Sequence, residues 1–408
     1  MKVLHINYFD NFGGAAKAAY RLHLALLENG IDSKILVQEK ESNDSDIIGP
    51  NIIEKYYGKL RFRVDRYKLR KYKSKYKYFF SASNTPFSYI PYKINKISPD
   101  ILHLHWFHIN MFTIKDLLKI KTPIIWTVHD MWGLSGGCFV SINCNKFKKE
   151  CGKCHILKST NPNDISNKLF KEKKSIYKNL DITIVSPSKW LKREFEELKV
   201  FKNIINIPNI TDINSYFKLN NKINLRKKYN IPIDKKAILF TAMRIDDINK
   251  GFQYLEEALE QINNKEIILL LLGDNWKNNK KIGKSRVYNF GFINKESIIN
   301  EIYNIADITI VPSIQENFSN VILESMATET PVISFNIGGN KDIIDHKSNG
   351  YLANPYDPKD IAEGINWILF ESNYKFISKL ARESVLKKFD KNITTKKHIN
   401  LYKKILKK

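Results

Sequence analysis

Two glutamates separated by seven residues, Glu316 and Glu324, are the pair best suited to chemistry in this sequence. Glu316 is expected in a loop after the predicted strand Asp307–Pro312, and Glu324 is expected one turn into the next helix. Carboxylates bind ribose and sugar hydroxyls well, and the N–H groups at a helix start suit a diphosphate. Two acidic residues near a helix start also interact favourably with the helix dipole. The spacing alone therefore does not decide between binding of a ligand and stabilisation of the helix.

Two cations precede these glutamates in the same half of the chain. Arg244 follows the predicted strand Ala237–Ala242, and Lys250 stands six residues later, directly before Gly251. Cations at the carboxyl end of a strand can neutralise a diphosphate leaving group without a metal ion. Because Lys and Arg are common in this chain, the pair alone does not decide the chemistry.

A glycine pair near the N-terminus is another place where an anion could bind. Gly13 and Gly14 stand between the predicted strand Val3–Asn7 and the predicted helix Ala15–Glu28, where small residues let backbone N–H groups approach an anion. The segment lacks the G-x-G-x-x-G spacing of dinucleotide-binding loops and the Gly-Lys-Ser/Thr of P-loops, which disfavours dehydrogenase and NTPase functions. Taken alone, the glycines are explained more simply by a tight turn.

The cysteines of the chain fall within one short segment that follows His129. They are Cys138, Cys144, Cys151 and Cys154. In a chain that is expected to be cytoplasmic, four clustered thiols favour a tetrahedral structural zinc site over disulfides, and the last two cysteines have the spacing of a half-site. Reduced free thiols are the alternative, because the first two cysteines are widely spaced; His155 could replace one ligand.

The length and composition predict a globular protein of two domains. The chain has 408 residues, of which 43% are hydrophobic, so it can form two ordinary cores. It contains no run of about eighteen uncharged apolar residues, and its N-terminus enters a strand pattern without a signal-peptide core. A cytoplasmic protein is therefore expected, one that could act at the inner face of the cell membrane.

The net charge of +25 is concentrated in the first half of the chain. Residues 1–200 hold 35 Lys and Arg against 19 Asp and Glu. Within Lys59–Lys77, basic residues alternate with aromatic and aliphatic ones, which suits an anionic membrane surface or a polyanionic substrate. A solvated basic face is the alternative. No nucleic-acid partner is expected, since no helix-turn-helix, RRM or zinc-finger pattern accompanies the charge.

Apolar runs that alternate with helical segments predict an α/β protein with two doubly wound, Rossmann-like parallel sheets. The runs are Val3–Asn7, Ser33–Val37, Ile101–His105, Ile124–Val128 and Ile182–Ser186, then Ala237–Ala242, Ile267–Gly273, Tyr288–Gly291, Asp307–Pro312 and Pro331–Phe335. We expect an N-terminal domain over residues 1–207, a C-terminal domain over 208–390, and a helix over 391–408 that packs back on the first domain, with a connector near Ile207–Ile231. Parallel sheets bind ligands at the carboxyl ends of their strands, so the site is expected in the cleft between the domains. His103 and His105, at the end of a buried strand, are expected to fill the core or line that cleft.

Several features occur in an order that is typical of one enzyme family. They are Gly13-Gly14, His129 after the fourth strand, Ser186-Pro187-Ser188, Pro208-Asn209, Arg244 with Lys250-Gly251, Gly273-Asp274, Gly291-Phe292, Glu316 with Glu324, Thr330-Pro331, Gly338-Gly339 and Asn349-Gly350. With these features the chain resembles glycosyltransferase family 4, the group 1 transferases, over nearly its whole length. The four-cysteine segment is similar to one found in some bacterial surface-polysaccharide transferases.

The resemblance implies a GT-B fold, with two Rossmann-like domains facing across a cleft, and a role for each matching residue. Arg244 and Lys250 would hold the donor diphosphate, Glu324 would bind the ribose, and Glu316 would lie near the donor sugar. His129 would lie beside the reacting centre on the acceptor side. The donor-binding residues would be Gly13, Gly14, Arg244, Lys250, Asn317, Phe318, Ser319 and Glu324.

The resemblance also implies a function, which is the transfer of a sugar from a UDP- or GDP-sugar to a saccharide, or a lipid-linked saccharide, in bacterial polysaccharide biosynthesis. The anomeric configuration would be retained, and catalysis would require no metal ion or other cofactor. Asn317 and Ser319 stand where the family commonly has glycine, and Glu329 departs from it as well, which puts the choice of sugar in doubt. The alternatives are a sugar-nucleotide 2-epimerase of the same fold and a non-catalytic basic protein that binds membranes or polyanions.

Overall fold

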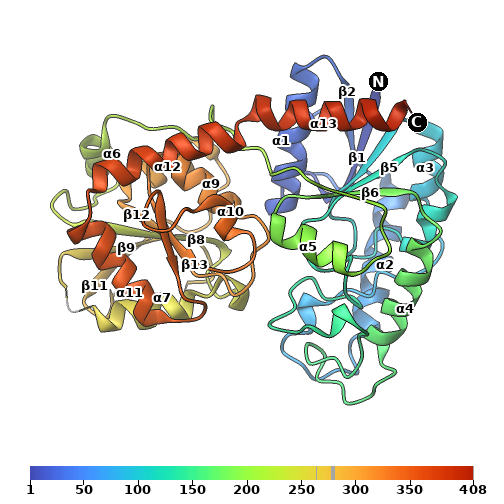
Figure 1. Ribbon diagram of the computed structural model, residues 1–408, viewed down its shortest axis with the longest axis horizontal. Coiled ribbons are helices and arrows are strands. Elements are labelled where there is room, and N and C mark those ends of the chain that lie inside the picture. The colour runs from blue at the N-terminus through green and yellow to red at the C-terminus, as the bar shows by residue number, and fades with distance from the viewer. Residues whose placement is uncertain (263, 277–280, 408) are drawn as a thin grey trace. The chain divides into compact units, whose positions relative to one another are not determined.

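The computed structural model describes residues 1–262, 264–276 and 281–407, and these residues form two compact units (Figure 1). Unit 1 consists of Met1–Pro208 together with Thr394–Lys408, and unit 2 consists of Asn209–Ile393. Lys408, the last residue of the expected C-terminal helix, lies outside the described residues. The division between Pro208 and Asn209 lies one residue after the boundary that we expected from the sequence.

Unit 1 is built on a parallel sheet with the strand order β3-β2-β1-β4-β5-β6-β7. The strands are β1 (Lys2–Phe9), β2 (Asp32–Glu39), β3 (Ile47–Ile48), β4 (Ile101–Leu104), β5 (Ile124–Thr127), β6 (Ile182–Ser186) and β7 (Asn203–Asn206). The helices are α1 (Gly14–Glu28), α2 (Ile52–Lys68), α3 (Ile90–Ile97), α4 (Ile165–Tyr177), α5 (Lys189–Glu197) and, from Thr394 onward, α13 (Lys391–Leu406). Because the strand order reverses between β1 and β4, ligands are expected at the carboxyl ends of these two strands.

Unit 2 repeats this plan with the strand order β10-β11-β9-β8-β12-β13-β14, in which only the β10–β11 pair is antiparallel among the described strands. The strands are β8 (Lys236–Arg244), β9 (Ile267–Asp274), β10 (Lys281–Ile282), β11 (Ser285–Asn289), β12 (Ile308–Val311), β13 (Val332–Phe335) and β14 (Gly350–Ala353). The helices are α6 (Lys222–Lys228), α7 (Phe252–Gln261), α8 (Glu296–Ile305), α9 (Asn320–Ala327), α10 (Asn340–Ile343), α11 (Pro358–Asn366) and α12 (Tyr374–Phe389). Here the order reverses between β8 and β12.

Both faces of the unit 2 sheet are buried, as its continuous apolar strands require. Leu239 and Leu270 lie on one face in a cluster with side chains of α8, α9 and α12. Phe240 and Leu269, the neighbouring residues on the same strands, lie on the other face in a cluster with side chains of α7 and α11. The alternation of side chains along each strand therefore supplies two cores from one sheet.

Side-chain caps fix the starts of two helices in unit 1. Asn51 accepts a hydrogen bond from the Glu54 backbone N–H at 2.9 Å, and the Glu54 carboxylate accepts one from the Asn51 N–H at 2.8 Å, so a capping box begins α2. Asp164 caps α4 by accepting hydrogen bonds from the backbone N–H groups of Ser166 and Asn167. These caps fix where α2 and α4 begin.

The structure corrects the expected connector and adds short strands to the expected runs. Within the predicted connector Ile207–Ile231, residues 222–228 form α6. Arg226 of this helix is buried, donates a hydrogen bond to the Ile305 carbonyl at 2.9 Å and pairs with Asp307 at 2.8 Å, so the segment is part of unit 2. The short strands β3, β7, β10 and β14 had no clear apolar run, and β11 begins before the predicted run Tyr288–Gly291.

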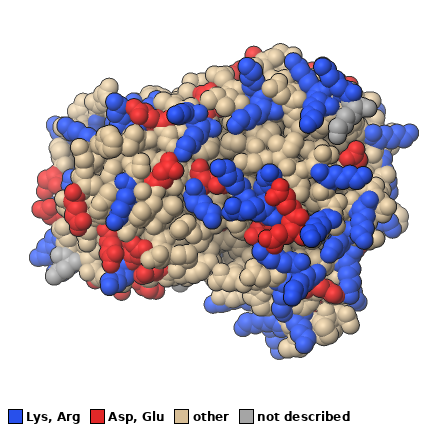
Figure 2. Space-filling model, viewed as in Figure 1, with Lys and Arg blue, Asp and Glu red and all other residues tan. Residues whose placement is uncertain are grey.

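Lys and Arg side chains gather over unit 1 (Figure 2). The predicted basic stretch Lys59–Lys77 is not wholly a surface feature, because Arg61 is only 1% exposed. Its guanidinium donates hydrogen bonds to the backbone carbonyls of Pro86 at 2.6 Å and Asn110 at 3.0 Å.

No helix among the described residues has both the length and the hydrophobicity needed to cross a membrane.

Candidate functional site

Unit 2 brings Lys250 and Glu316 together where its strand order reverses. They lie in the loops after the neighbouring strands β8 and β12, and Lys250 Nζ is 3.1 Å from Glu316 Oε2. The side chains remain partly exposed, at 34% for Lys250 and 17% for Glu316. The charge of Glu316 is the main cause of a raised pKa for Lys250, so this ammonium group is fully charged at neutral pH. A reachable cation and a carboxylate thus meet at the carboxyl edge of the sheet.

Asn249 and Gly251, on either side of Lys250, hold the two loops against each other. The Asn249 side-chain amide donates to the Gln315 carbonyl at 3.1 Å and accepts from the Gln315 N–H at 3.2 Å. Gly251 has a φ of +69°, and a Cβ atom there would lie 1.9 Å from the Pro312 carbonyl oxygen, so only glycine fits. The sequence analysis did not assign this positioning role to Asn249, whose only signal is its place between a strand and a helix.

Arg244 ends β8 and is held by an acid that the sequence analysis did not name. Its Nε and Nη2 atoms donate to the two Asp246 carboxylate oxygens at 3.0 and 2.9 Å. Hydrogen bonding to Asp246 raises the pKa of Arg244. Both side chains are largely exposed, and an exposed ion pair of this kind contributes little to stability, so the guanidinium can turn to another anion at small cost.

Glu324 lies on α9 and is a buried carboxylate, only 5% exposed. Its Oε2 accepts a hydrogen bond from the hydroxyl of Tyr303, on α8, at 3.3 Å. The three predicted donor-binding residues before α9, Asn317, Phe318 and Ser319, are also buried, and the Phe318 ring packs edge-on against Phe389 in the core. The Ser319 side chain makes no capping hydrogen bond to α9. The backbone, and not the Phe318 side chain, is therefore what this segment can offer to a ligand.

His129 follows β5 in unit 1 and ends a chain of hydrogen-bonded imidazoles. Its Nε2 atom is 3.2 Å from His105 Nδ1, and His105 Nε2 is 3.0 Å from His5 Nδ1. Burial lowers the pKa of His129 to about 4 and lowers the pKa values of His5 and His105 well below the usual range. All three imidazoles are therefore neutral at pH 7, and burial makes His129 a weaker base than a solvent-exposed histidine.

His103 has the core role that the sequence predicted. Its Nδ1 atom is 2.7 Å from the hydroxyl of Tyr402, on α13, and its Nε2 atom is 2.7 Å from Thr127 Oγ1. Among the described residues, the one set of three His, Cys, Asp or Glu side chains with all ligand atoms within 4.8 Å is His5, His103 and His105. Both ring nitrogens of His103 and of His105 have hydrogen-bond partners, whereas His5 Nε2 is buried without one in the described part of the chain.

Asp130, next to His129, is a further residue that the sequence analysis did not assign. Its carboxylate accepts hydrogen bonds from Trp106 Nε1 at 2.7 Å, His108 Nε2 at 2.9 Å and the Trp132 N–H at 2.8 Å. Burial alone would raise the pKa of Asp130, but the His108 charge and these hydrogen bonds lower it. A fixed carboxylate therefore anchors the loop that carries His129.

Gly13 and Gly14 lie at the start of α1, after the carboxyl end of β1. Gly13 is the N-cap residue and has a φ of +92°, a conformation that favours glycine. The first turn of α1 contains no acidic residue, so no side-chain carboxylate of that turn competes for its N–H groups. The position is compatible with an anion, and the assignment of Gly13 and Gly14 to donor binding stays a prediction.

The four cysteines line one small cavity of about 20 Å³ together with His155. None of them forms a disulfide; Cys138, Cys151 and Cys154 are buried, and Cys144 is partly exposed. Cys151 Sγ accepts a hydrogen bond from the Gly136 N–H at 3.3 Å. Although the cysteines share the cavity, no three of their sulfur atoms, all within the described chain, form a set within 4.8 Å.

Two family models match the chain. The model described as Glycosyltransferase Family 4 matches residues 12–215, which is half of the chain, and the model described as Glycosyl transferases group 1 matches residues 235–371. The chain belongs to glycosyltransferase family 4. The second match includes the loops that carry Arg244, Lys250, Glu316 and Glu324, so the predicted resemblance is confirmed.

Three relatives are similar to this family 4 protein. An uncharacterized glycosyltransferase of Methanocaldococcus jannaschii is 31% identical over 237 residues, 54% of this chain and 59% of that protein. An Escherichia coli K12 protein named for colanic acid biosynthesis is 22% identical over 365 residues, 86% of each chain. A Campylobacter jejuni N,N'-diacetylbacillosaminyl-diphospho-undecaprenol α-1,3-N-acetylgalactosaminyltransferase is 25% identical over 182 residues, 44% of this chain and 47% of that one. The chain thus spans less than two thirds of the first and third relatives.

Solved structures resemble the family 4 protein over nearly its whole length. The sucrose-phosphate synthase from Thermosynechococcus elongatus has a TM-score of 0.73 at 18% identity and covers 99% of both chains. The Anabaena protein HepE in complex with UDP-glucose has a TM-score of 0.65 at 15% identity and covers 99% of this chain and 100% of that one. These likenesses confirm the predicted GT-B fold of two Rossmann-like domains.

Proposed function

We propose that this family 4 protein transfers a sugar from a nucleotide-sugar to a saccharide acceptor in bacterial polysaccharide biosynthesis, with retention of the anomeric configuration. The observation that carries the proposal is the Lys250–Glu316 pair, which lies at the strand-order reversal of unit 2, with Glu316 in the loop that leads into α9. The colanic acid relative, which matches 86% of this chain, supports the assignment to polysaccharide biosynthesis.

In the proposed reaction, unit 2 binds the donor. Lys250 and Arg244 neutralise the diphosphate as the bond to the sugar breaks, and the backbone before α9 offers N–H groups to its oxygens. Glu316 lies beside the sugar, and Glu324 accepts hydrogen bonds from the ribose hydroxyls. Two cations can stabilise the departing nucleoside diphosphate, so we propose that catalysis needs no metal ion. The Anabaena neighbour is in complex with UDP-glucose, which favours a UDP-sugar; a GDP-sugar is the other candidate.

Unit 1 is proposed to bind the acceptor. His129 is neutral at pH 7 because its pKa is about 4, and it would lie beside the acceptor hydroxyl with its ring held by His105. The name of the Campylobacter relative includes a diphospho-undecaprenol carrier, which supports a lipid-linked acceptor. Exposed cations of Lys59–Lys77 would then meet the anionic inner face of the cell membrane.

Nucleotide binding tests the donor half of the proposal. We expect a thermal-shift screen of UDP-, GDP-, ADP- and dTDP-sugars to identify a UDP- or GDP-sugar that stabilises the protein. Glu324→Gln should weaken that binding about tenfold to a hundredfold, because hydrogen bonds to a charged acceptor contribute about 1.5–3 kcal/mol. Glu257→Gln, which changes an exposed acid of α7, should leave the affinity unchanged.

Equal affinity of the wild type and the folded Glu324→Gln variant for the nucleotide-sugar would contradict the ribose assignment.

The proposed retention of configuration is tested separately by NMR of the product formed at early time points, because the coupling constant of the anomeric proton reports the configuration of the new bond. We expect the configuration of the donor sugar; the opposite configuration would overturn retention.

A further inference from the structure

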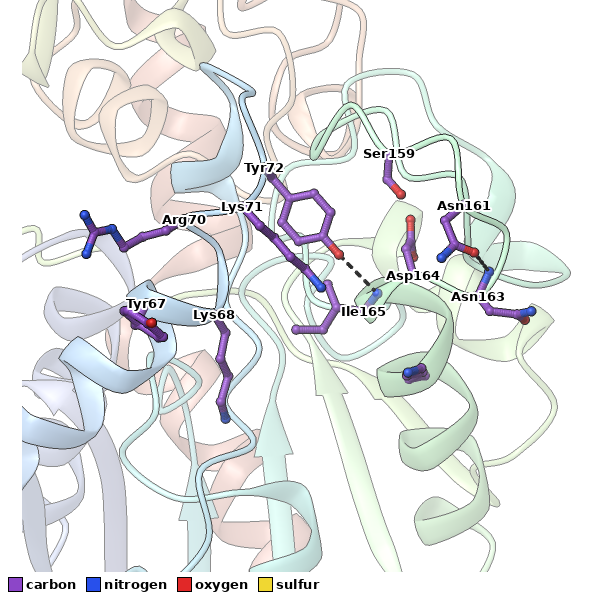
Figure 3. A pocket seen from close by; sticks show the side chains of 11 residues that line it. Tyr67, Lys68, Arg70, Lys71, Tyr72, Ser159, Asn161, Asn163, Asp164 and Ile165 are labelled. Carbon is purple, nitrogen blue, oxygen red and sulfur yellow. Dashed lines mark hydrogen bonds between the residues drawn. The ribbon is translucent and has the colours of Figure 1, made fainter.

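A basic pocket in unit 1 lies apart from the residues assigned to sugar transfer (Figure 3). Its volume is about 780 Å³. One wall is the end of α2 and the residues after it, from Tyr67 to Tyr72, and the other is the segment from Ser159 to Lys168 at the start of α4. Figure 3 shows the Tyr72 ring and the Lys71 side chain reaching toward Ile165 on the opposite wall.

The pocket has a strong excess of positive charge. Its cations are Lys68, Arg70, Lys71 and Lys168. The ammonium group of Lys68 donates to the neutral Asn84 Oδ1 at 2.6 Å, and no ion pair with Arg70, Lys71 or Lys168 occurs among the described residues.

The one acid that lines the pocket is already engaged. Asp164 accepts hydrogen bonds from the backbone N–H groups of Cys154 and Ser166, both at 2.9 Å, and of Asn167 at 3.1 Å. These bonds direct its oxygens to the protein backbone. An anion from outside the chain is therefore what this pocket can attract.

The other lining side chains suit a sugar. Tyr67 is 70% exposed, and Tyr72 lies across from the carboxamides of Asn161 and Asn163. The apolar face of a sugar ring can pack on a tyrosine ring, while carboxamides can donate to and accept from its hydroxyls. Arg70 lies 5.8 Å from the Tyr67 ring and Lys71 lies 5.3 Å from the Tyr72 ring, so each end of this wall combines an aromatic ring with a cation.

We propose that this pocket binds an anionic saccharide, one whose sugar units carry carboxylate or phosphate groups. The proposal rests on the proposed function, since it names the chemical class of the acceptor chain that unit 1 recognises. A recess of this volume can take a few sugar units, and most small-ligand sites have a volume of this order. A planar layer of lipid headgroups would contact only the rim of the pocket, so we favour the saccharide over a membrane surface.

The test is a titration of the full-length protein, without donor, against a galacturonic acid trimer and a phosphorylated disaccharide. We expect at least one of them to bind, and its methyl-esterified or dephosphorylated form to bind at least tenfold more weakly. Arg70→Glu/Lys71→Glu should weaken binding at least tenfold. The matched control Lys121→Glu/Lys178→Glu makes the same change of net charge at exposed lysines of unit 1 outside the pocket, and should change affinity less than threefold.

Three outcomes would overturn this proposal: neither acidic saccharide binds, the control variant loses as much affinity as the pocket variant, or only vesicles with anionic lipid bind. The thermal shift by nucleotide-sugars should be the same in the wild type and in Arg70→Glu/Lys71→Glu. If wild-type protein binds the acidic saccharide but no nucleotide-sugar, the proposed function fails and the pocket stands; the reverse result removes the pocket alone.

The four-cysteine segment supports a second, independent inference. Between β5 and α4, residues 128–164 contain only one short helical turn, Lys146–Lys148, within the described elements. Ile142, Asn143, Lys153 and Lys158 have positive φ angles in this segment. So long a segment without regular structure needs another source of order.

We propose that Cys138, Cys144, Cys151 and Cys154 bind a structural zinc ion. All four line the same small cavity, and Cys151 accepts a backbone hydrogen bond. A buried lysine, Lys173, holds the start of the segment by donating hydrogen bonds to the carbonyls of Trp132 at 2.6 Å and Ser135 at 3.1 Å. The sulfur atoms must draw together on binding, since a tetrahedral site has Zn–S distances of about 2.3 Å.

Metal analysis of protein purified without chelator tests this second proposal. We expect about one zinc ion per chain in the wild type and in His155→Ala, and a loss of at least tenfold in Cys151→Ser/Cys154→Ser. Cobalt substitution should produce a thiolate-to-metal charge-transfer band in the wild type and in His155→Ala, but not in Cys151→Ser/Cys154→Ser. Wild-type protein that contains no zinc after expression in zinc-supplemented medium, and that gives no cobalt band, would overturn the proposal.

Discussion

Lys250→Ala is expected to lower kcat by about a hundredfold to a thousandfold, the usual cost of removing one group that stabilises developing negative charge. Lys250 is fully charged and lies 3.1 Å from Glu316, so its loss removes a positive charge and leaves a carboxylate unpaired beside the diphosphate. The effect should fall mainly on kcat, because charge on the leaving group grows in the transition state. Steady-state kinetics with the donor identified by the thermal-shift screen would measure it.

Matched variants separate this role from a general effect of charge. Lys375→Ala removes an exposed lysine of unit 2 and should leave kcat unchanged, whereas Lys250→Arg should keep part of the activity. Glu316→Ala should also lower turnover, and the double variant should be less impaired than the product of the single effects, since residues in contact are not additive. Normal turnover in Lys250→Ala or Glu316→Ala would remove the site assignment.

The unfolding free energy of unit 1 is expected to fall by several kcal/mol as the pH is lowered from 7 to 5. Burial lowers the pKa to about 4 for His129 and to about 3 for His398, and it lowers the pKa values of His5, His103 and His105 well below the usual range. Below pH 6.5 these imidazoles bind protons in the unfolded chain but not in the native one, so acid favours unfolding. Each buried histidine can therefore lower the unfolding free energy by up to about 2 kcal/mol at pH 5, because a difference of one pKa unit corresponds to about 1.4 kcal/mol.

Thermal melts at pH 7 and pH 5 would measure this loss. His398→Leu removes one buried imidazole from α13 and should reduce the difference between the two melting temperatures. His346→Gln, which changes an exposed histidine of unit 2, should leave the difference as it is in the wild type. Equal melting temperatures at the two pH values in the wild type would contradict the neutral state of the buried histidines.

The sheet strands could be predicted from the sequence because each is a local apolar run between turns. The five main strands of each half fall within a few residues of the predicted runs. β3 and β10 have only two residues each, and the side chains of β7 are only partly buried. Their apolar runs are therefore too short or too weak to be recognised in the sequence. The prediction that Ile207–Ile231 is a connector was wrong because the sequence around α6 is polar. The guanidinium of Arg226 is nevertheless buried there, and its partners come from other segments of the chain.

The residues of the site could be named from the sequence, but most of their contacts could not. Lys250 and Glu316 were each predicted at the end of a strand, yet their direct contact depends on β8 and β12 being neighbours in the sheet. Asp246 and Asn249, which hold the neighbouring groups, are ordinary polar loop residues in the sequence. Strand order is a property of the whole sheet, so a local pattern does not contain it.

The Lys250–Glu316 pair and the imidazole chain differ in how much of each could be inferred from the sequence and how much required the folded structure. The two parallel-sheet domains, the loops with the candidate site residues and the family could all be inferred from the sequence. Hydrophobic periodicity and the order of motifs are properties of the linear chain, so they can be recognised without the fold. Only the tertiary structure decided that His5, His105 and His129 form one chain of hydrogen bonds, and that α2 and the residues before α4 enclose a basic pocket. These contacts join residues that lie between 24 and 100 positions apart in the chain, because the packing of the sheet and its covering helices brings their segments together.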